Sequence, residues 1–228
     1  MAFDDRSDAG RRLAQLLEER ALPDPVVNGM ARGGVPVAFE IARALPAPLD
    51  VVVVRKLGHP EQPELGLGAI GEEGVRLVNE ELVAQLRVPS EVIDAVAARE
   101  RQELDRRLRT YRGDRPPVAV EGRTAIVVDD GLATGFTARA AVEVMRRRRA
   151  ASVVLAVPVG PPAAVAALRR VADEVVCVEE TERFFGISEW YLDFHQVSDA
   201  EVADLLATAG NADTGDAGGT GDSDGDRG

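Results

Sequence analysis

The chain has 228 residues, of which 45% are hydrophobic and 29% charged, and its formal net charge is −12. This length fits one generous domain or two small ones and disfavours a large repeat array. The apolar content is enough for a buried core, while the charged content excludes a membrane-embedded chain. The acidic balance disfavours binding to phosphate backbones. We therefore expect no nucleic-acid partner and no membrane partner.

The cysteine content and the N-terminal residues indicate the cellular compartment of the protein. Cys177 is the single cysteine, so no intrachain disulfide can form. The N-terminus carries acidic residues where a secretory signal would have a basic and then an apolar stretch. Both observations predict a cytoplasmic protein.

The first third of the chain alternates helical and strand-like patterns. Leucines at helical spacing predict a helix from Ser7 to just before Pro23, and an apolar run predicts a strand over 26–30, followed by a short helix. The consecutive valines of 49–54 predict a strand buried on both faces, which is typical of a parallel sheet. Prolines and glycines over 58–71 predict a long loop that runs into an irregular extended segment, and loops of this length often act as lids.

The second half repeats this alternation more clearly. A helix with a dense charged face is expected over 90–111. Strand and helix patterns then follow in turn over 125–128, 137–148, 153–159, 162–171 and 175–178. This order predicts an α/β fold, with a parallel sheet of about five strands flanked by helices and with ligand-binding residues at the strand ends.

The C-terminal stretch has a different composition. Residues 208–228 include five aspartates, one arginine and seven glycines, and no apolar side chain larger than alanine. Such a segment cannot bury enough apolar surface to order itself. We expect one domain over 1–207 and a disordered acidic tail over 208–228.

The strongest functional signal is an apolar strand that ends in Asp129 and Asp130 and turns into a helix. The turn consists of Gly131, Leu132, Ala133, Thr134, Gly135, Phe136 and Thr137. Its glycines allow close backbone approach, its threonines offer hydroxyls, and the free N–H groups of the next helix attract an anion, so it predicts a phosphate site. The two carboxylates suit the vicinal hydroxyls of a sugar. Together they predict binding of a ribose 5-phosphate.

Two other segments place basic residues after strands. Ala31, Arg32, Gly33 and Gly34 follow the strand over 26–30 and predict a second anion nest. The pair Arg55 and Lys56 follows the valine strand. By itself each segment is also typical of a solvent-exposed turn.

These segments together resemble the type I phosphoribosyltransferases, whose signature is an apolar strand, two acids and a Thr-Gly-x-Thr loop. The resemblance implies that the loop over 131–137 binds the 5-phosphate of phosphoribosyl pyrophosphate and that Asp129 and Asp130 hold the ribose. It also implies that the 31–34 loop and Arg55 with Lys56 bind the pyrophosphate. Within that loop, the Ala31–Arg32 peptide bond is expected to be cis or strained.

The segment 184–195 contains five of the nine aromatic residues. It is similar to the C-terminal hood of that family, placed here at about 180–197. The resemblance implies that Phe185 stacks on the base and that Asp193 contacts a metal ion, which is otherwise held by substrate oxygens and waters. A small satellite hydrophobic core is the alternative interpretation of these rings.

The resemblance implies a type I phosphoribosyltransferase fold and Mg²⁺-dependent transfer of the phosphoribosyl group to a nitrogen nucleophile, expected to be a nucleobase. Arg32 and Lys56 would balance the charge of the departing pyrophosphate. Ala133 stands where the hypoxanthine-guanine branch has an acid, which disfavours that branch. The family commonly forms homodimers. A non-catalytic sensor of phosphoribosyl pyrophosphate and a hydrolase of ribose phosphates remain alternatives.

Overall fold

The structure is a computed structural model, and it describes residues 2–213. Its body is a parallel sheet of five strands in the order β2-β1-β6-β7-β8. The bounds of these strands are β1 (Pro25–Met30), β2 (Leu49–Val52), β6 (Thr124–Val128), β7 (Ser152–Gly160) and β8 (Glu174–Glu180). The predicted α/β class and the number of parallel strands are confirmed.

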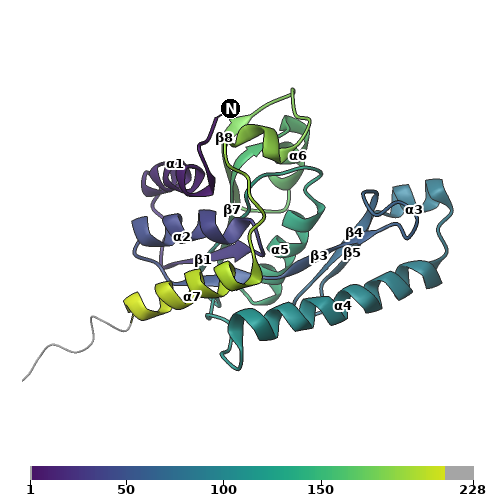
Figure 1. The fold of residues 1–228 in the computed structure, drawn as a ribbon, viewed down its shortest axis with the longest axis horizontal. Helices are drawn as coiled ribbons and strands as arrows, with labels where there is room; N and C mark the ends of the chain where they lie inside the picture. Colours follow the sequence, from purple (N-terminus) through teal and green to yellow (C-terminus); the bar gives the residue numbers. More distant parts are fainter. Residues whose placement is uncertain (1, 214–228) are drawn as a thin grey trace, which may run out of the picture.

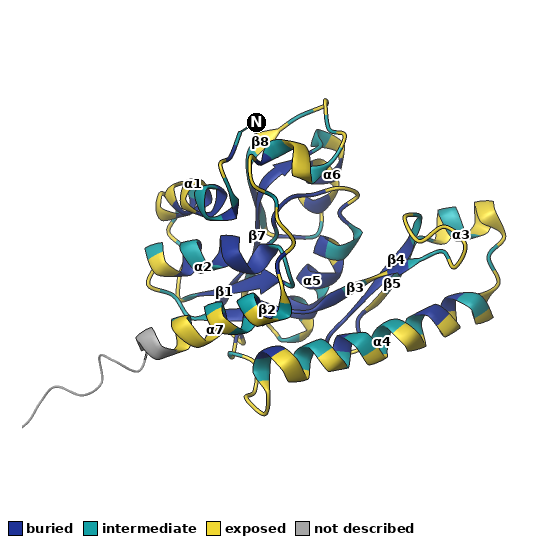
Figure 2. Cartoon of the chain, viewed as in Figure 1, coloured by how far each residue is buried: buried dark blue, intermediate teal, exposed yellow. Residues whose placement is uncertain are grey.

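Helices cover both faces of this sheet, which explains its valine-rich strands. One face packs against α1 (Arg6–Glu18) and α2 (Gly34–Ala44), and the other against α5 (Phe136–Arg147) and α6 (Pro162–Leu168). Successive strand side chains point to opposite faces, so Ile126 enters the first core and Val127 the second. The strands are accordingly buried between layers of helices (Figure 2).

A second sheet extends to one side of the body (Figure 1). Its antiparallel strands β3 (Val54–Gly58), β4 (Gly66–Gly71) and β5 (Arg76–Val78) are followed by α3 (Glu80–Leu86) and α4 (Ser90–Arg112). We call residues 54–112 the arm. Helix α4 packs along β3, and α5 of the body contacts β4.

The arm corrects two predictions. The single strand predicted over 49–54 is split at Val53. Of the long loop and irregular extended segment predicted over 58–71, only a connection over 59–65 is irregular, because Gly66–Gly71 is a regular strand. Its glycines permit close packing: a Cβ on Gly68 would lie 2.1 Å from the Leu77 carbonyl oxygen of β5. A glycine-rich composition normally indicates a loop, but in β4 the glycines allow two strands to pair closely.

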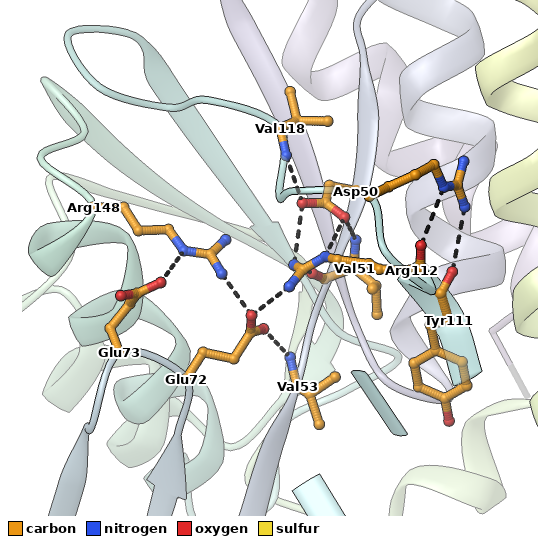
Figure 3. A network of polar contacts seen from close by, with 10 residues as sticks. Asp50, Val51, Val53, Glu72, Glu73, Tyr111, Arg112, Val118 and Arg148 are labelled. Atoms are coloured by element: carbon orange, nitrogen blue, oxygen red, sulfur yellow. Dashed lines mark hydrogen bonds and ion pairs between the residues drawn. The ribbon is translucent and has the colours of Figure 1, made fainter. Parts of the chain in front are cut away.

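A buried ionic network joins the arm to the body (Figure 3). The Arg112 guanidinium contacts Asp50 Oδ1 at 3.0 Å and Glu72 Oε2 at 2.5 Å, and Arg148 of the α5 C-cap reaches the same Glu72 oxygen at 2.6 Å. Glu72 Oε1 accepts the N–H of Val53 at 2.8 Å. The chain therefore crosses from one sheet to the other at a point fixed by four charged side chains.

Helix α7 (Asp199–Asp213) extends further than expected. Val202 and Leu206 are buried against α4 and β2, and they anchor the helix. Residues 208–213, predicted to belong to the acidic tail, form the last part of this helix instead. The remainder of the predicted tail, 214–228, lies outside the described residues. Within the described part, no helix is both long enough and apolar enough to cross a membrane.

The hood connects β8 to α7 and contains one turn of 3₁₀-helix over Ile187–Trp190. Its rings form a small cluster with the N-terminus: the Phe3 and Tyr191 ring centroids lie 5.4 Å apart, and those of Tyr191 and Phe194 lie 5.1 Å apart. The alternative of a satellite hydrophobic core is therefore confirmed for Tyr191 and Phe194.

Candidate functional site

The candidate site lies where the loops after β1 and β6 leave the parallel sheet. These strands are neighbours, with Gly29 paired to Val128. The chain passes from β1 to β2 on one side and from β6 through β7 to β8 on the other, so the strand order reverses between β1 and β6. Open α/β sheets bind ligands at the carboxyl ends of strands at such a reversal.

Two glycines bring the two loops into contact. A Cβ on Gly33 would lie 2.0 Å from Asp130 Oδ2, and one on Gly34 would lie 2.3 Å from the Val128 carbonyl oxygen. The backbone after β1 therefore rests directly against the acids after β6. The Ala31–Arg32 peptide bond is cis, as predicted.

The loop over 131–135 has the backbone features expected of an anion site. Leu132 is buried and its N–H donates to the Val159 carbonyl at 2.8 Å, which anchors the loop to β7. Gly135 begins α5 with φ +78°, a conformation that favours glycine, and no side chain caps this helix. Thr134 is exposed and Thr137 half-buried. The free N–H groups at the start of α5 are thus available to a phosphate.

The two acids occupy different environments. The Asp129 Oδ1 atom accepts the N–H of Asp130 at 2.9 Å, and no cation pairs with Asp129 among the described residues. Burial and the neighbouring Asp130 raise the pKa of Asp129 well above its usual range. Burial also raises the pKa of Asp130, but Arg6 opposes this shift. The negative charge of Asp130 is therefore compensated within the protein by Arg6.

Arg6 is a site residue that the sequence analysis missed. It is 7% exposed, its Nε donates to Asp130 Oδ2 at 2.9 Å, and its Nη1 donates to the His195 carbonyl at 2.8 Å. Its guanidinium carbon lies 3.9 Å from the centroid of the Phe194 ring. One sequence signal was available: a cation in the first turn of a helix opposes the helix dipole.

A cavity of about 330 Å³ opens between these groups. It is lined by Arg6, Arg32, Gly33 and Asp130, and by the hood residues 194–197. The structure thus brings together Arg32 and Gly33 of one predicted loop and Asp130 of the other. Two guanidinium groups beside a carboxylate suit a ligand that carries both anionic groups and hydroxyls.

Comparison with known proteins assigns the fold to a family. The family model of the phosphoribosyl transferase domain matches residues 5–194. The chain belongs to the phosphoribosyl transferase family. The match runs from the start of α1 into the hood, so both Arg6 and Phe194 lie inside the family domain.

Two relatives of this phosphoribosyl transferase domain are informative. A Mycobacterium tuberculosis protein, found in strains H37Rv and CDC 1551 and provisionally named a phosphoribosyl transferase, is 51% identical over 207 residues. The alignment covers 91% of this chain and 47% of that protein, so the chain spans about half the length of the curated relatives it matches. The crystal structure of TT1426 from Thermus thermophilus is 42% identical, with a TM-score of 0.78, and the match covers 91% of this chain and 99% of TT1426.

The basic pair predicted for this phosphoribosyl transferase site lies elsewhere. Arg55 and Lys56 are in β3 of the arm, because the valine strand is split, and neither lines the 330 Å³ cavity. Both Nε and Nη2 of Arg55 contact Glu100 Oε2, at 3.0 and 2.8 Å. Lys56 is exposed and pairs with Glu64, with 3.7 Å between Nζ and Oε2. Their position directly after a strand of the parallel sheet was wrongly predicted, and their contact with pyrophosphate stays a prediction.

The two hood residues expected at the phosphoribosyl transferase site differ in their surroundings. Phe185 is 84% exposed and free to meet a ligand. Asp193 is bound to His195, whose N–H donates to Asp193 Oδ1 at 3.0 Å. Residues 2–213 contain no group of three or more acidic, histidine or cysteine side chains placed to hold a metal ion. The contact of Asp193 with a metal ion stays a prediction.

A larger cavity of about 550 Å³ lies away from the phosphoribosyl transferase site. It is bordered by the C-terminal end of α2, the start of β2 and the last turns of α4 and α7. This position is at the opposite ends of the parallel strands, and none of the predicted site residues lines it. The predicted loops instead meet at the smaller cavity, which is therefore the candidate site.

Proposed function

We propose that the chain transfers the phosphoribosyl group of phosphoribosyl pyrophosphate to a nitrogen nucleophile, with a nucleobase as the acceptor class, and releases pyrophosphate. The observation that carries this proposal is the contact between the two loops, which places Arg32, Gly33 and Asp130 around one cavity at the β1–β6 reversal. Membership of the family supports the same reaction.

Each part of the site has a task in this reaction. The backbone N–H groups of the 131–137 loop hold the 5-phosphate, and Asp129 and Asp130 accept hydrogen bonds from the ribose hydroxyls. The bond between C1 and the pyrophosphate oxygen breaks with its electron pair, a C1–N bond forms, and the acceptor nitrogen loses a proton. Positive charge develops on the ribose, and the nearby carboxylates stabilise it. Arg32 and the loop over 31–34 bind the departing pyrophosphate.

The test measures release of pyrophosphate from phosphoribosyl pyrophosphate across a panel of purine and pyrimidine bases. Each base is assayed with Mg²⁺ and with EDTA, which tests the Mg²⁺ dependence of the proposed reaction. The Asp129→Asn/Asp130→Asn variant serves as the site variant. Glu121→Gln, which changes an exposed acid paired with Arg149, is the matched control.

Release that depends on one class of base, and that is lost only in the site variant, would support transfer. Release of pyrophosphate without any base would instead indicate a hydrolase. Binding of phosphoribosyl pyrophosphate without release for any acceptor would overturn transfer in favour of a sensor. Absence of binding to folded wild-type protein would refute the site itself.

The homodimer expected from the family resemblance is also part of the proposal. Light scattering of the purified chain should give twice the chain mass of 24.3 kDa. A mass equal to one chain at assay concentrations would contradict it.

A further inference from the structure

We propose that Arg6 is a positioning residue that fixes Asp130 and the hood in one arrangement around the ligand cavity. Its effect on ligand binding rests on the function proposed above, whereas its effect on the hood does not. The inference starts from three contacts that one buried side chain makes to two distant segments.

The contacts of Arg6 connect α1, the loop after β6 and the hood. The guanidinium binds Asp130 Oδ2 at 2.9 Å and the His195 carbonyl at 2.8 Å, and it stacks on Phe194 at 3.9 Å. A planar guanidinium offers these donors in a fixed geometry, so it sets the relative position of the groups that it binds. Arg6 therefore connects the acid of the site to the segment that closes over it.

Asp130 is held through both its side chain and its backbone carbonyl group. Arg6 binds the carboxylate, and the Tyr191 hydroxyl donates to the Asp130 carbonyl oxygen at 2.7 Å. The carboxylate also lies against Gly33, where a Cβ would be 2.0 Å from Oδ2. A change in the Asp130 rotamer would therefore displace the loop that carries Arg32.

Burying the Arg6 cation at the start of a helix costs free energy unless other contacts offset it. Its side chain is 8% exposed, so the cation has lost most of its hydration, and it begins a helix where the dipole disfavours positive charge. A surface arginine of the same helix avoids both costs: Arg12 is 44% exposed and pairs with Asp8 at 2.9 Å. The contacts of Arg6 with Asp130, the His195 carbonyl and the Phe194 ring offset this cost.

Without Arg6, the groups that remain around the Asp130 carboxylate would not fix its orientation. Asp129 from the same loop repels it, and Arg32 and His195 line the same cavity from the loop after β1 and from the hood. Without Arg6, the carboxylate can turn toward Arg32 or take up a proton. Either change misaligns the two loops, and misplacement of about 1 Å at a site typically costs on the order of 100-fold in rate.

The experiment uses the full chain with four variants and a matched control. Arg6→Gln removes the charge, Arg6→Lys keeps it without the planar geometry, and Arg12→Gln is the control on the same helix. Asp130→Asn and the double variant Arg6→Gln/Asp130→Asn complete a cycle. Two quantities are measured: the Kd of phosphoribosyl pyrophosphate with Mg²⁺ by calorimetry, and amide hydrogen exchange of residues 186–197 in the ligand-free protein.

We expect Arg6→Gln to weaken binding roughly 10- to 100-fold, Arg6→Lys to recover part of the loss, and Arg12→Gln to bind like wild type. In the Asp130→Asn background, Arg6→Gln should weaken binding by less than about threefold, because Arg6 acts through Asp130. Exchange in 186–197 should be faster in Arg6→Gln than in Arg12→Gln.

Equal Kd values for Arg6→Gln and Arg12→Gln, or full additivity in the cycle, would overturn the positioning role. If Arg6→Gln does not fold, Arg6→Lys provides the same comparison. If wild-type protein does not bind phosphoribosyl pyrophosphate, the proposed function fails, and hydrogen exchange alone decides the inference. Faster exchange would then support Arg6 as the residue that holds the hood, and unchanged exchange would refute it.

Discussion

At the scale of single residues, the site depends on one glycine as much as on its charged groups. Gly33 allows the loop after β1 to touch the Asp130 carboxylate, since any Cβ there would fall 2.0 Å from Oδ2. Asp130 cannot yield easily, because Arg6 and Tyr191 hold it. A side chain at position 33 would therefore clash with a carboxylate that is held in place, which cannot move aside like the end of a flexible side chain.

Gly33→Ala should weaken binding of phosphoribosyl pyrophosphate by tenfold or more and lower the free energy of unfolding by about 1–3 kcal/mol, as overpacking generally does. Gly210→Ala is the control, because its nearest neighbour is the end of the Arg115 side chain at 3.8 Å. Calorimetric titration and urea unfolding measure both effects. Binding of wild-type strength by Gly33→Ala would show that the loops are not in contact.

The unpaired acid should make stability depend on pH. The folded pKa of Asp129 is raised, so between about pH 4 and that raised value the folded chain binds more protons than the unfolded one. This group therefore stabilises the fold least at high pH, and Asp129→Asn should gain stability relative to wild type as pH rises. The gain cannot exceed about 1.4 kcal/mol for each pH unit.

Urea unfolding of wild type and Asp129→Asn from pH 4 to 8 tests this expectation. Asp114→Asn, at an exposed position, is the control and should show a constant difference from wild type. A constant difference for Asp129→Asn as well would mean that Asp129 is not desolvated. A stabilised variant without ligand binding would show that the site is built at the expense of stability.

The site residues that sequence reasoning found and missed differ in one respect. Asp129, Asp130 and the loop that follows them are contiguous, so one segment contains both the acids and the phosphate cradle. Arg6 is 124 residues from Asp130, and nothing local to either residue connects them. Contacts of this kind depend on how α1 packs on the sheet, which a single sequence does not encode in a readable pattern.

At the scale of elements, periodicity predicted the buried parallel strands and most helices, including α4 of the arm, but not the antiparallel sheet of the arm. The run over 49–54 reads as one strand, yet the chain changes sheet at Val53, whose N–H donates to Glu72. Strand β2 is an edge strand, and side chains satisfy its outer backbone groups: Asp50 Oδ1 accepts the Val51 N–H at 2.8 Å, and Arg112 donates to the Val51 carbonyl. Glu72 and Arg112 come from a distant turn and a distant helix, so the split had no local signal.

The network that satisfies this edge includes Arg112, the last residue of α4. Arg112→Met should lower the free energy of unfolding by about 3–5 kcal/mol, because Asp50 would keep a buried charge without its cation and Glu72 would keep only Arg148. Arg109→Ala, at an exposed position of the same helix, should change stability by less than about 0.5 kcal/mol. Chemical unfolding distinguishes the two. A small effect of Arg112→Met would mean that water or Arg148 compensates the two acids.

At the scale of the whole molecule, the site is assembled from parts that fold around different cores. The parallel body supplies both loops, whereas the hood and α7 close the chain back across them (Figure 1). Helix α7 begins next to the site, where Asp199 lies 3.9 Å from Arg32 and accepts a hydrogen bond from the Tyr111 hydroxyl at 2.7 Å. The C-terminal helix therefore belongs to the domain and connects the site to α4.

Two truncations test where this domain ends. Removing 214–228 should leave the free energy of unfolding within about 0.5 kcal/mol of the full chain, since that segment has no apolar side chain larger than alanine. Removing 199–228 also deletes Val202 and Leu206, which are buried, and each such side chain contributes about 1.5–3 kcal/mol. The shorter chain should therefore melt about 10 °C lower or more. Scanning calorimetry measures both, and a large loss from the first truncation would move the domain boundary past Asp213.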